Sequence, residues 1–282
     1  IFTANQSLAE VDPSQVTVHP DAPFTVDTSG RSVGIRFPVP LHDDTEYSVR
    51  IAGVTGLAGR TESAFETSFR TPVLHAYLLR RGGEGTTQDE IVETDLDGNA
   101  ETVFRHAHIE DFRAAPTGLV VSVQNEDGFA QLFWVPRDGG DPRELPLPGE
   151  GTFSNLQVSE RGDLVGYTWS DATLASGSGR ESELFLTDLT DPDAEPHALA
   201  LGSADPSIDD YRFVPDSPAI LLLNFAGELL LVEPGGSPAP LGSALWIDDI
   251  ARGEPKAWVE RLDGPVVIDL SDASESPSTA TV

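Results

Sequence analysis

The sequence predicts an all-β fold, and three observations support that prediction. Short segments with alternating apolar and polar residues recur along the chain, whereas no stretch carries a long apolar pattern at helical spacing. The 26 glycines and 22 prolines are scattered throughout, which indicates frequent turns. From residue 73 onward, sets of strands separated by turns rich in Gly, Pro and Asp repeat. We therefore expect many short antiparallel strands in two regions.

Residues 1–72 make up the first predicted domain. The segment EYSVRIAGV alternates as a half-buried strand does, with Tyr47, Val49 and Ile51 on one face and polar residues on the other. Further short strands precede and follow it, and Pro72 ends the last of them because proline has no N–H for a ladder. We expect these strands to bury their apolar faces against one another.

A family resemblance refines this first domain. The segment PLHDDTEYSVRIAGVTGLAGRTESAFETSFRTP, Pro40 to Pro72, resembles the C-terminal half of bacterial Ig-like domains found in surface-layer and other secreted proteins. The initial IFTANQSL resembles the second strand of that family, whose first strand would precede Ile1. The resemblance implies a partial Ig-like β-sandwich that lacks its first strand.

The region 73–282 repeats a unit of strand, tight turn, strand, polar turn and short final strand. The turns DLDGN, PRDGGDP, DLTDPDAEP and EPGGSPAP occupy the same place in successive units. The unit length of roughly 40 to 55 residues is that of a four-stranded propeller blade. About five blades are predicted, with bounds near 73–107, 108–151, 152–204, 205–243 and 244–282.

One position in the aligned units carries an acid or its amide. It is occupied by Asp111, Asn155, Asp210 and Asp249. The segments that follow, FRAAPTG, LQVSERGD, YRFVPDSP and IARGEP, resemble the fSPDGk.la motif of TolB-type and related WD40-like β-propellers. In that family the strand entering the motif is the innermost one, beside the central channel.

The resemblance therefore implies that these four residues lie at or near the channel mouth. There they are predicted to bind a ligand, either a cationic group or Ca²⁺, which takes six to eight oxygen ligands. The alternative is that they are solvated loop acids on an acidic surface.

The first repeat of the region 73–282 begins at its second strand, HAYLLRR, so either five blades close in an unusual way or C-terminal blades lie beyond this sequence. We expect the latter.

The segment RHAHIED is the sharpest metal candidate. Residues two apart on a strand share a face, so His106 and His108 could meet one ion with Glu110 as the third ligand. The alternative is a pair of loop histidines. DLDGNAETVF begins like a calcium loop, but its twelfth position is His106 rather than Glu. We therefore expect a hairpin turn with Gly98 at positive φ.

The formal net charge of -30 limits the classes of partner that the protein is expected to bind. Such a surface repels phosphate backbones and anionic lipids, so nucleic acid and membrane surfaces are poor partners, and we expect no nucleic acid binding and no direct membrane insertion of this segment. Solubility, salt tolerance or a cationic partner would account for the acidity. The chain has no cysteine and no methionine, and no apolar run is long enough to span a bilayer. We expect a processed or truncated extracellular or cell-surface protein whose signal or anchor segment is missing from this sequence.

No motif for catalysis or nucleotide binding is present. The serines of ASGSGRES, residues 175–182, do not match a nucleophile elbow, and this segment is predicted to be a projecting loop. Trp134 and Trp169 are predicted to pack in the core, and Trp246 to be partly exposed near a blade edge.

The predicted function is a non-catalytic bacterial binding or scaffold protein, without catalytic residues or a cofactor. Its propeller face would contact a protein or a cell-envelope component. The alternatives are the accessory propeller domain of a larger hydrolase and a metal-binding propeller enzyme that uses Ca²⁺ or another divalent ion.

Overall fold

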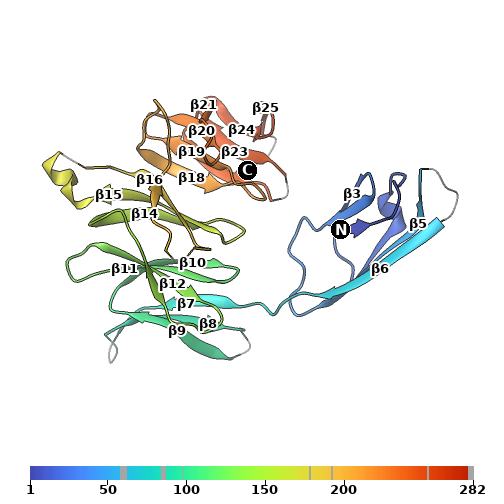
Figure 1. The fold of residues 1–282 in the computed structure, drawn as a ribbon, viewed down its shortest axis with the longest axis horizontal. Helices are drawn as coiled ribbons and strands as arrows, with labels where there is room; N and C mark the ends of the chain where they lie inside the picture. The colour runs from blue at the N-terminus through green and yellow to red at the C-terminus, as the bar shows by residue number, and fades with distance from the viewer. Residues whose placement is uncertain are drawn as a thin grey trace. The chain divides into compact units, whose positions relative to one another are not determined.

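A computed structural model describes residues 1–57, 62–83, 87–96, 98–177, 179–191, 193–252 and 254–278 (Figure 1). The chain divides into two compact units, Ile1–Ala76 with Thr94–Asn99, and Tyr77–Glu93 with Ala100–Val282. The all-β prediction is confirmed, since the helices of the described residues are the short 3-10 helices η1 (Pro13–Gln15) and η2 (Ala172–Ser176). No helix in these ranges has the length and apolar character needed to cross a membrane.

The first unit contains two three-stranded sheets. One has the order β1 (Phe2–Thr3), β4 (Ser32–Arg36), β3 (Thr25–Ser29), and the other β2 (Val16–His19), β5 (Glu46–Thr55), β6 (Glu62–Arg70). Tyr47, Val49 and Ile51 on β5 are buried, as their alternation predicts, and pack in one cluster with Val33 of β4. The two sheets therefore share a core.

The second unit contains five antiparallel sheets among the described residues, and each follows chain order. The first sheet is β7 (Ala76–Arg80), β8 (Asp89–Thr94) and β9 (Ala100–His106). The second is β10 (Ile109–Ala115), β11 (Gly118–Gln124), β12 (Ala130–Pro136) and β13 (Arg143–Leu145). The third is β14 (Gly151–Val158), β15 (Leu164–Asp171), β16 (Glu183–Asp188) and β17 (His197–Ala198). The fourth is β18 (Ile208–Phe213), β19 (Ile220–Asn224), β20 (Glu228–Val232) and β21 (Ala239–Ser243). The fifth is β22 (Trp246–Ile250), β23 (Lys256–Arg261), β24 (Gly264–Asp269) and β25 (Ser274–Pro277).

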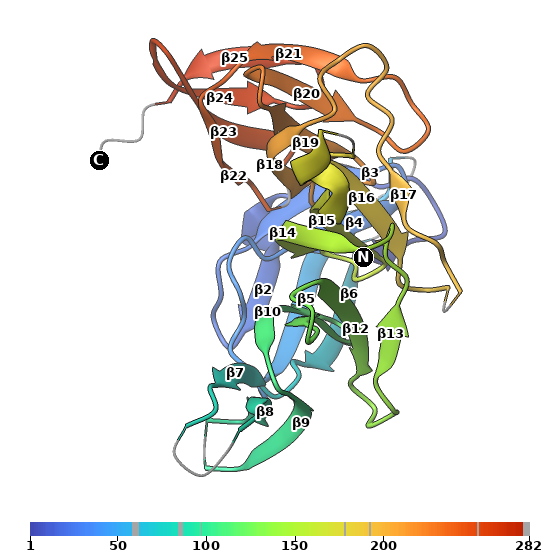
Figure 2. The same ribbon diagram turned by 90° about the vertical axis from the view of Figure 1, so that its left-hand side faces the viewer.

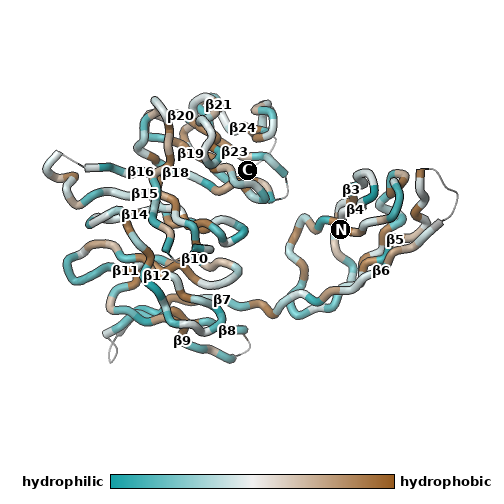
Figure 3. Tube along the Cα trace, viewed as in Figure 1, coloured by the Kyte–Doolittle hydropathy of each residue, from teal (hydrophilic) through white to brown (hydrophobic). Residues whose placement is uncertain are grey.

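The core of the second unit lies between successive sheets. Four apolar clusters each join one sheet to the next in chain order, and the apolar residues gather along the middle strands (Figure 3). On β19, Leu222 belongs to the cluster shared with the third sheet, and Leu221 to the cluster shared with the fifth. A strand covered on both faces reads as a continuous apolar run, which explains the segment AILLLN.

The first strands of the four-stranded sheets lie next to one another. β10, β14, β18 and β22 each form the same edge of their sheet. β10 contacts β14, β14 contacts β18, and β18 contacts β22 (Figure 2). Side chains tens of residues apart in sequence thereby become neighbours.

Candidate functional site

A β-bulge recurs at one place on the four first strands. The ladder register shifts between Ile109 and Asp111, Ser154 and Gln157, Ile208 and Asp210, and Ile247 and Asp249. The four predicted ligand-binding residues lie at these bulges, so the alignment of the units matches equivalent backbone positions. A bulge interrupts the ladder and leaves local backbone groups in need of other partners.

The aspartates supply such partners. The Oδ1 atoms of Asp111, Asp210 and Asp249 each accept the N–H of the next residue at 2.8 Å. One oxygen of each carboxylate is therefore committed to its own strand. This recurring bond gives the repeated aspartate a structural role that does not depend on a ligand.

An arginine two residues later further occupies two of these carboxylates. Arg113 Nη1 donates to Asp111 Oδ1 at 2.6 Å and to the Phe112 carbonyl at 2.9 Å. Arg212 Nη1 makes the same two bonds, to Asp210 Oδ1 and to the carbonyl of the intervening tyrosine. The charges of Asp111 and Asp210 are thus partly compensated within the protein.

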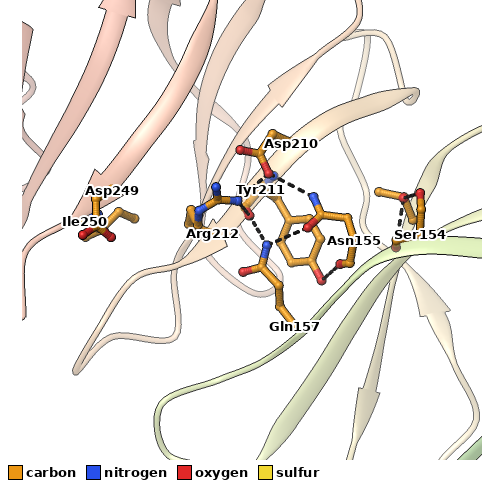
Figure 4. Close-up of polar contacts among 9 residues, drawn as sticks. Ser154, Asn155, Gln157, Asp210, Tyr211, Arg212, Asp249 and Ile250 are labelled. Atoms are coloured by element: carbon orange, nitrogen blue, oxygen red, sulfur yellow. Dashed lines mark hydrogen bonds and ion pairs between the residues drawn. The ribbon is translucent and has the colours of Figure 1, made fainter. Parts of the chain in front are cut away.

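The third and fourth sheets meet through a polar network around Tyr211 (Figure 4). Asn155 Nδ2 donates to Asp210 Oδ1 at 3.0 Å, and Tyr211 Oη donates to the Asn155 carbonyl at 2.9 Å. Gln157 Nε2 donates to Asn155 Oδ1 at 2.9 Å and to the Tyr211 carbonyl at 2.5 Å. Burial raises the pKa of Tyr211 well above its ordinary value, so the hydroxyl remains a donor.

The structure therefore brings two of the four predicted residues together. Asn155 contacts Asp210, whereas the bonds described for Asp111 and Asp249 lie within their own strands. Asn155 has a φ of +51°, a left-handed conformation that Asn tolerates better than most residues. The amide at this position makes a bond between sheets that a carboxylate, having no N–H, would not donate.

The residue before each aspartate is exposed, and on β22 the aspartate itself, Asp249, is exposed as well. Glu110, Asp209 and Asp248 lie at the bulges of β10, β18 and β22, and we call them the acidic row. The sequence marked these positions as the first member of each acid pair, but Asp209 and Asp248 were not predicted as site residues. On β10 and β18 the first member of the pair is more exposed than the second, which the spacing alone did not indicate.

The predicted metal ligands make other contacts. His106 Nδ1 lies 3.2 Å from the backbone nitrogen of His108. Glu110 accepts from Ser122 Oγ at 3.3 Å and from Gln124 Nε2 at 3.4 Å. Within the described ranges no three His, Asp or Glu side chains are grouped to hold a metal ion. Metal binding here stays a prediction, which metal analysis of the purified protein tests.

The calcium-loop candidate forms a turn. Gly98 has the predicted positive φ, +111°. The Asn99 N–H donates to Asp95 Oδ1 at 3.2 Å. Asp97 of this segment lies outside the described residues.

The predicted projecting loop leaves the third sheet between β15 and β16. Its base is closed by Asp171, which accepts from Trp169 Nε1 at 2.6 Å and from the Arg180 N–H at 2.9 Å. Hydrogen bonds from Arg180 hold the pKa of Asp171 down to about 2. Within the loop, η2 extends away from the sheet (Figure 1).

Comparisons with known proteins show similarity of fold. No protein-family profile matches the chain, and no curated protein matches it. A prolyl endopeptidase structure shares 11% identity at a TM-score of 0.53, over 95% of this chain and 42% of that one. The chain thus spans less than half of that protein's length.

Two further structures are similar at lower scores. Apo AztD from Citrobacter koseri shares 15% identity over 98% of this chain and 72% of its own, with a TM-score of 0.45. Sqt1 from Chaetomium thermophilum shares 11% identity over 82% of this chain and 68% of its own, with a TM-score of 0.46. The likeness to the endopeptidase and the order of the sheets fit a β-propeller.

Proposed function

We propose that the chain is a non-catalytic binding protein that acts outside the cell or at its surface. Its second unit, a β-propeller of the WD40-like or TolB type, binds a cationic segment of a partner protein. The observation that carries the proposal is the acidic row. Glu110, Asp209 and Asp248 are exposed at matching bulges, on first strands that run through one contiguous series.

The charge distribution supports a cationic partner. Among the described residues, no ion pair within 4.0 Å involves Asp209 or Asp248, whereas Asp210 is paired with Arg212. The net charge of -30 adds a long-range attraction for cations. Binding of this kind is fast and weakens as salt is added.

The proposed location, outside the cell or at its surface, rests on a family resemblance of the first unit. The segment Pro40–Pro72 supports an Ig-like assignment for the first unit, and Ig-like domains of this type occur in secreted proteins. An upstream export signal in the gene would agree with this part of the proposal, whereas an in-frame cytosolic domain there would contradict it.

The test compares two variants with equal changes in charge. The row variant combines Glu110→Gln, Asp209→Asn and Asp248→Asn, and the control combines Asp141→Asn, Glu160→Gln and Asp193→Asn at exposed positions outside the strands. A lysine-rich peptide at low salt is expected to bind the row variant about tenfold more weakly than the wild type, and the control by much less. Equal losses in both variants would show that only net charge matters and would reject the row as the site.

The likeness to a prolyl endopeptidase favours one alternative. The chain matches 42% of that protein, so it would be the accessory propeller of a larger hydrolase. The gene downstream of Val282 decides this alternative. A hydrolase domain in the same reading frame would support it, and a stop codon or a membrane anchor would reject it.

A further inference from the structure

Large apolar side chains are exposed beside the acidic row. Phe225, Leu245, Trp246 and Leu262 are 60%, 42%, 51% and 90% exposed, and we call them the apolar patch. The exposure of Trp246 agrees with its prediction, as does the burial of Trp134 and Trp169. Exposed apolar residues that gather in one place mark interaction surfaces more often than scattered ones do.

Backbone hydrogen bonds place the four patch residues on adjacent segments. The Ala244 N–H donates to the Gly227 carbonyl at 3.0 Å, which joins the turn that contains Phe225 to the start of β22. The Leu245 N–H donates to the Glu260 carbonyl at 2.8 Å, beside the turn that contains Leu262. The patch therefore spans the fourth and fifth sheets of the propeller.

Hydrogen bonds hold two side chains at the patch in place, those of Arg261 and Trp246. Arg261, whose side chain is only 13% exposed, donates to the Leu241 carbonyl at 2.7 Å and also to the Ser243 carbonyl and to Glu275. Trp246 Nε1 donates to Asp248 Oδ1 at 2.9 Å, so a carboxylate of the acidic row orients the indole. An indole fixed in this way loses little conformational entropy when it binds.

The surroundings of the patch are acidic. Exposed carboxylates on the same strands and turns are Asp209, Glu228, Asp248, Asp249 and Asp263. The nearby guanidinium of Arg261 is occupied by the carbonyls and by Glu275. A second copy of this chain would bring carboxylates against carboxylates, whereas a cationic segment would pair with them.

We propose that the apolar patch binds a segment of a partner protein in which apolar side chains adjoin lysine or arginine. The inference rests on the proposed function and names the class of partner for that surface. The apolar side chains cover Trp246 and Leu262, and the flanking cations meet Asp248 and Asp263. Affinity comes mainly from the buried aromatic and aliphatic contacts, and the charges set orientation and rate.

The experiment uses two synthetic peptides of equal charge, one alternating lysine with leucine and the other lysine with serine. Tryptophan fluorescence is a suitable readout, because Trp246 is exposed while Trp134 and Trp169 are buried and Trp258 is half-buried. The lysine–leucine peptide is expected to bind about tenfold more tightly and to shift the emission to shorter wavelength. A double variant, Phe225→Ser with Leu262→Ser, is expected to remove that advantage and leave lysine–serine binding unchanged.

Leu78→Ser, at a 55% exposed leucine on β7, is the matched control and is expected to retain the advantage. Equal affinities of the wild type for the two peptides would overturn the patch inference but leave the acidic row in place. Loss of discrimination by the row variant, with no loss by the patch variant, would also overturn it. Self-association that the patch variant abolishes, seen by sedimentation, would make a second copy the occupant and overturn the proposed partner class.

Discussion

At the residue scale, Tyr211 connects two sheets through both its hydroxyl and its ring. Its Oη donates to the Asn155 carbonyl, and the side chain is fully buried. Gly166 on β15 faces it so closely that an added Cβ would lie 2.8 Å from Oη and 3.1 Å from Cε2. The glycine and the tyrosine therefore have to be considered together.

We predict that Tyr211→Phe lowers the free energy of unfolding by about 1–2 kcal/mol, because the partly buried Asn155 carbonyl loses its donor. Urea denaturation followed by tryptophan fluorescence measures the loss. Tyr77→Phe is a suitable control, since the Tyr77 hydroxyl bonds to the partly exposed Glu93 at 3.2 Å and is expected to contribute less. A larger loss in the control would contradict the importance of the contact between sheets.

We predict that Gly166→Ala costs about 1–3 kcal/mol in the wild type, because its methyl group would collide with Tyr211. In a Tyr211→Leu background the same change should cost less than in the wild type, since the colliding atoms are gone. A double-mutant cycle from denaturation curves measures the difference. Identical costs in the two backgrounds would show that the strain at Gly166 arises elsewhere.

The sequence predicted where the repeated aspartates lie better than what they do. Asp111, Asp210 and Asp249 do occupy equivalent positions, because the repeat that aligns them reflects equivalent sheets. Their bonds to the following N–H were not predictable, since a bulge depends on the pairing of two strands and leaves no spacing signal of its own. A pair of adjacent acids is compatible with a ligand site and also with a bulge at which a carboxylate accepts the following N–H.

At the element scale, the loop between β15 and β16 is anchored at its base by Asp171 and Arg180. Two atoms of the Arg180 side chain and its N–H donate to the Asp171 carboxylate, and Trp169 donates to it as well. The guanidinium also lies over the Phe185 ring, 5.1 Å from its centroid. The sequence predicted a projecting loop here but not its anchor, because Asp171 and Arg180 are nine residues apart and neither belongs to a recognisable motif.

We predict a pH dependence from this anchor. The folded pKa of Asp171, about 2, lies below the ordinary value of 3.8, so its contribution to stability is complete above about pH 4. As the pH falls from about 4 to about 2 the carboxylate is protonated and the contribution is lost. After allowance for solvent screening the loss is about 1 kcal/mol. Asp171→Asn should unfold more readily than the wild type at pH 7, and the difference should shrink below pH 4 in thermal melts.

The strands themselves were the most predictable elements. Alternation in β5 placed Tyr47, Val49 and Ile51 on the buried face, where the structure has them. Burial on both faces, as in β11 and β19, produces an apolar run without alternation. In those strands the apolar run indicates that both faces are buried, but it does not indicate which residue faces which neighbouring sheet.

At the scale of the whole molecule, the apolar core is divided. One cluster belongs to the first unit, and four others each join two successive sheets of the second. All four tryptophans, at positions 134, 169, 246 and 258, lie in the second unit. Tryptophan fluorescence therefore reports on that unit alone.

We predict that Ile51→Ala destabilises the first unit by about 2–5 kcal/mol, since Ile51 is fully buried in that unit's cluster. The transition seen by tryptophan fluorescence should keep its midpoint, while far-UV circular dichroism should show an earlier phase. A matched change, Leu222→Ala in the second unit, should move the fluorescence transition. Equal shifts of the fluorescence midpoint in both variants would show that the two units unfold together.

The clusters between successive sheets also determine how the second unit responds to mechanical load. The three middle sheets are each held by two neighbours and the first and fifth by one, and no single cluster of the described residues runs through all five sheets. Under tension the sheets should therefore detach in turn, and each detachment should release one chain segment of a few tens of residues. A protein built in this way would dissipate force in small steps while its remaining sheets stay folded.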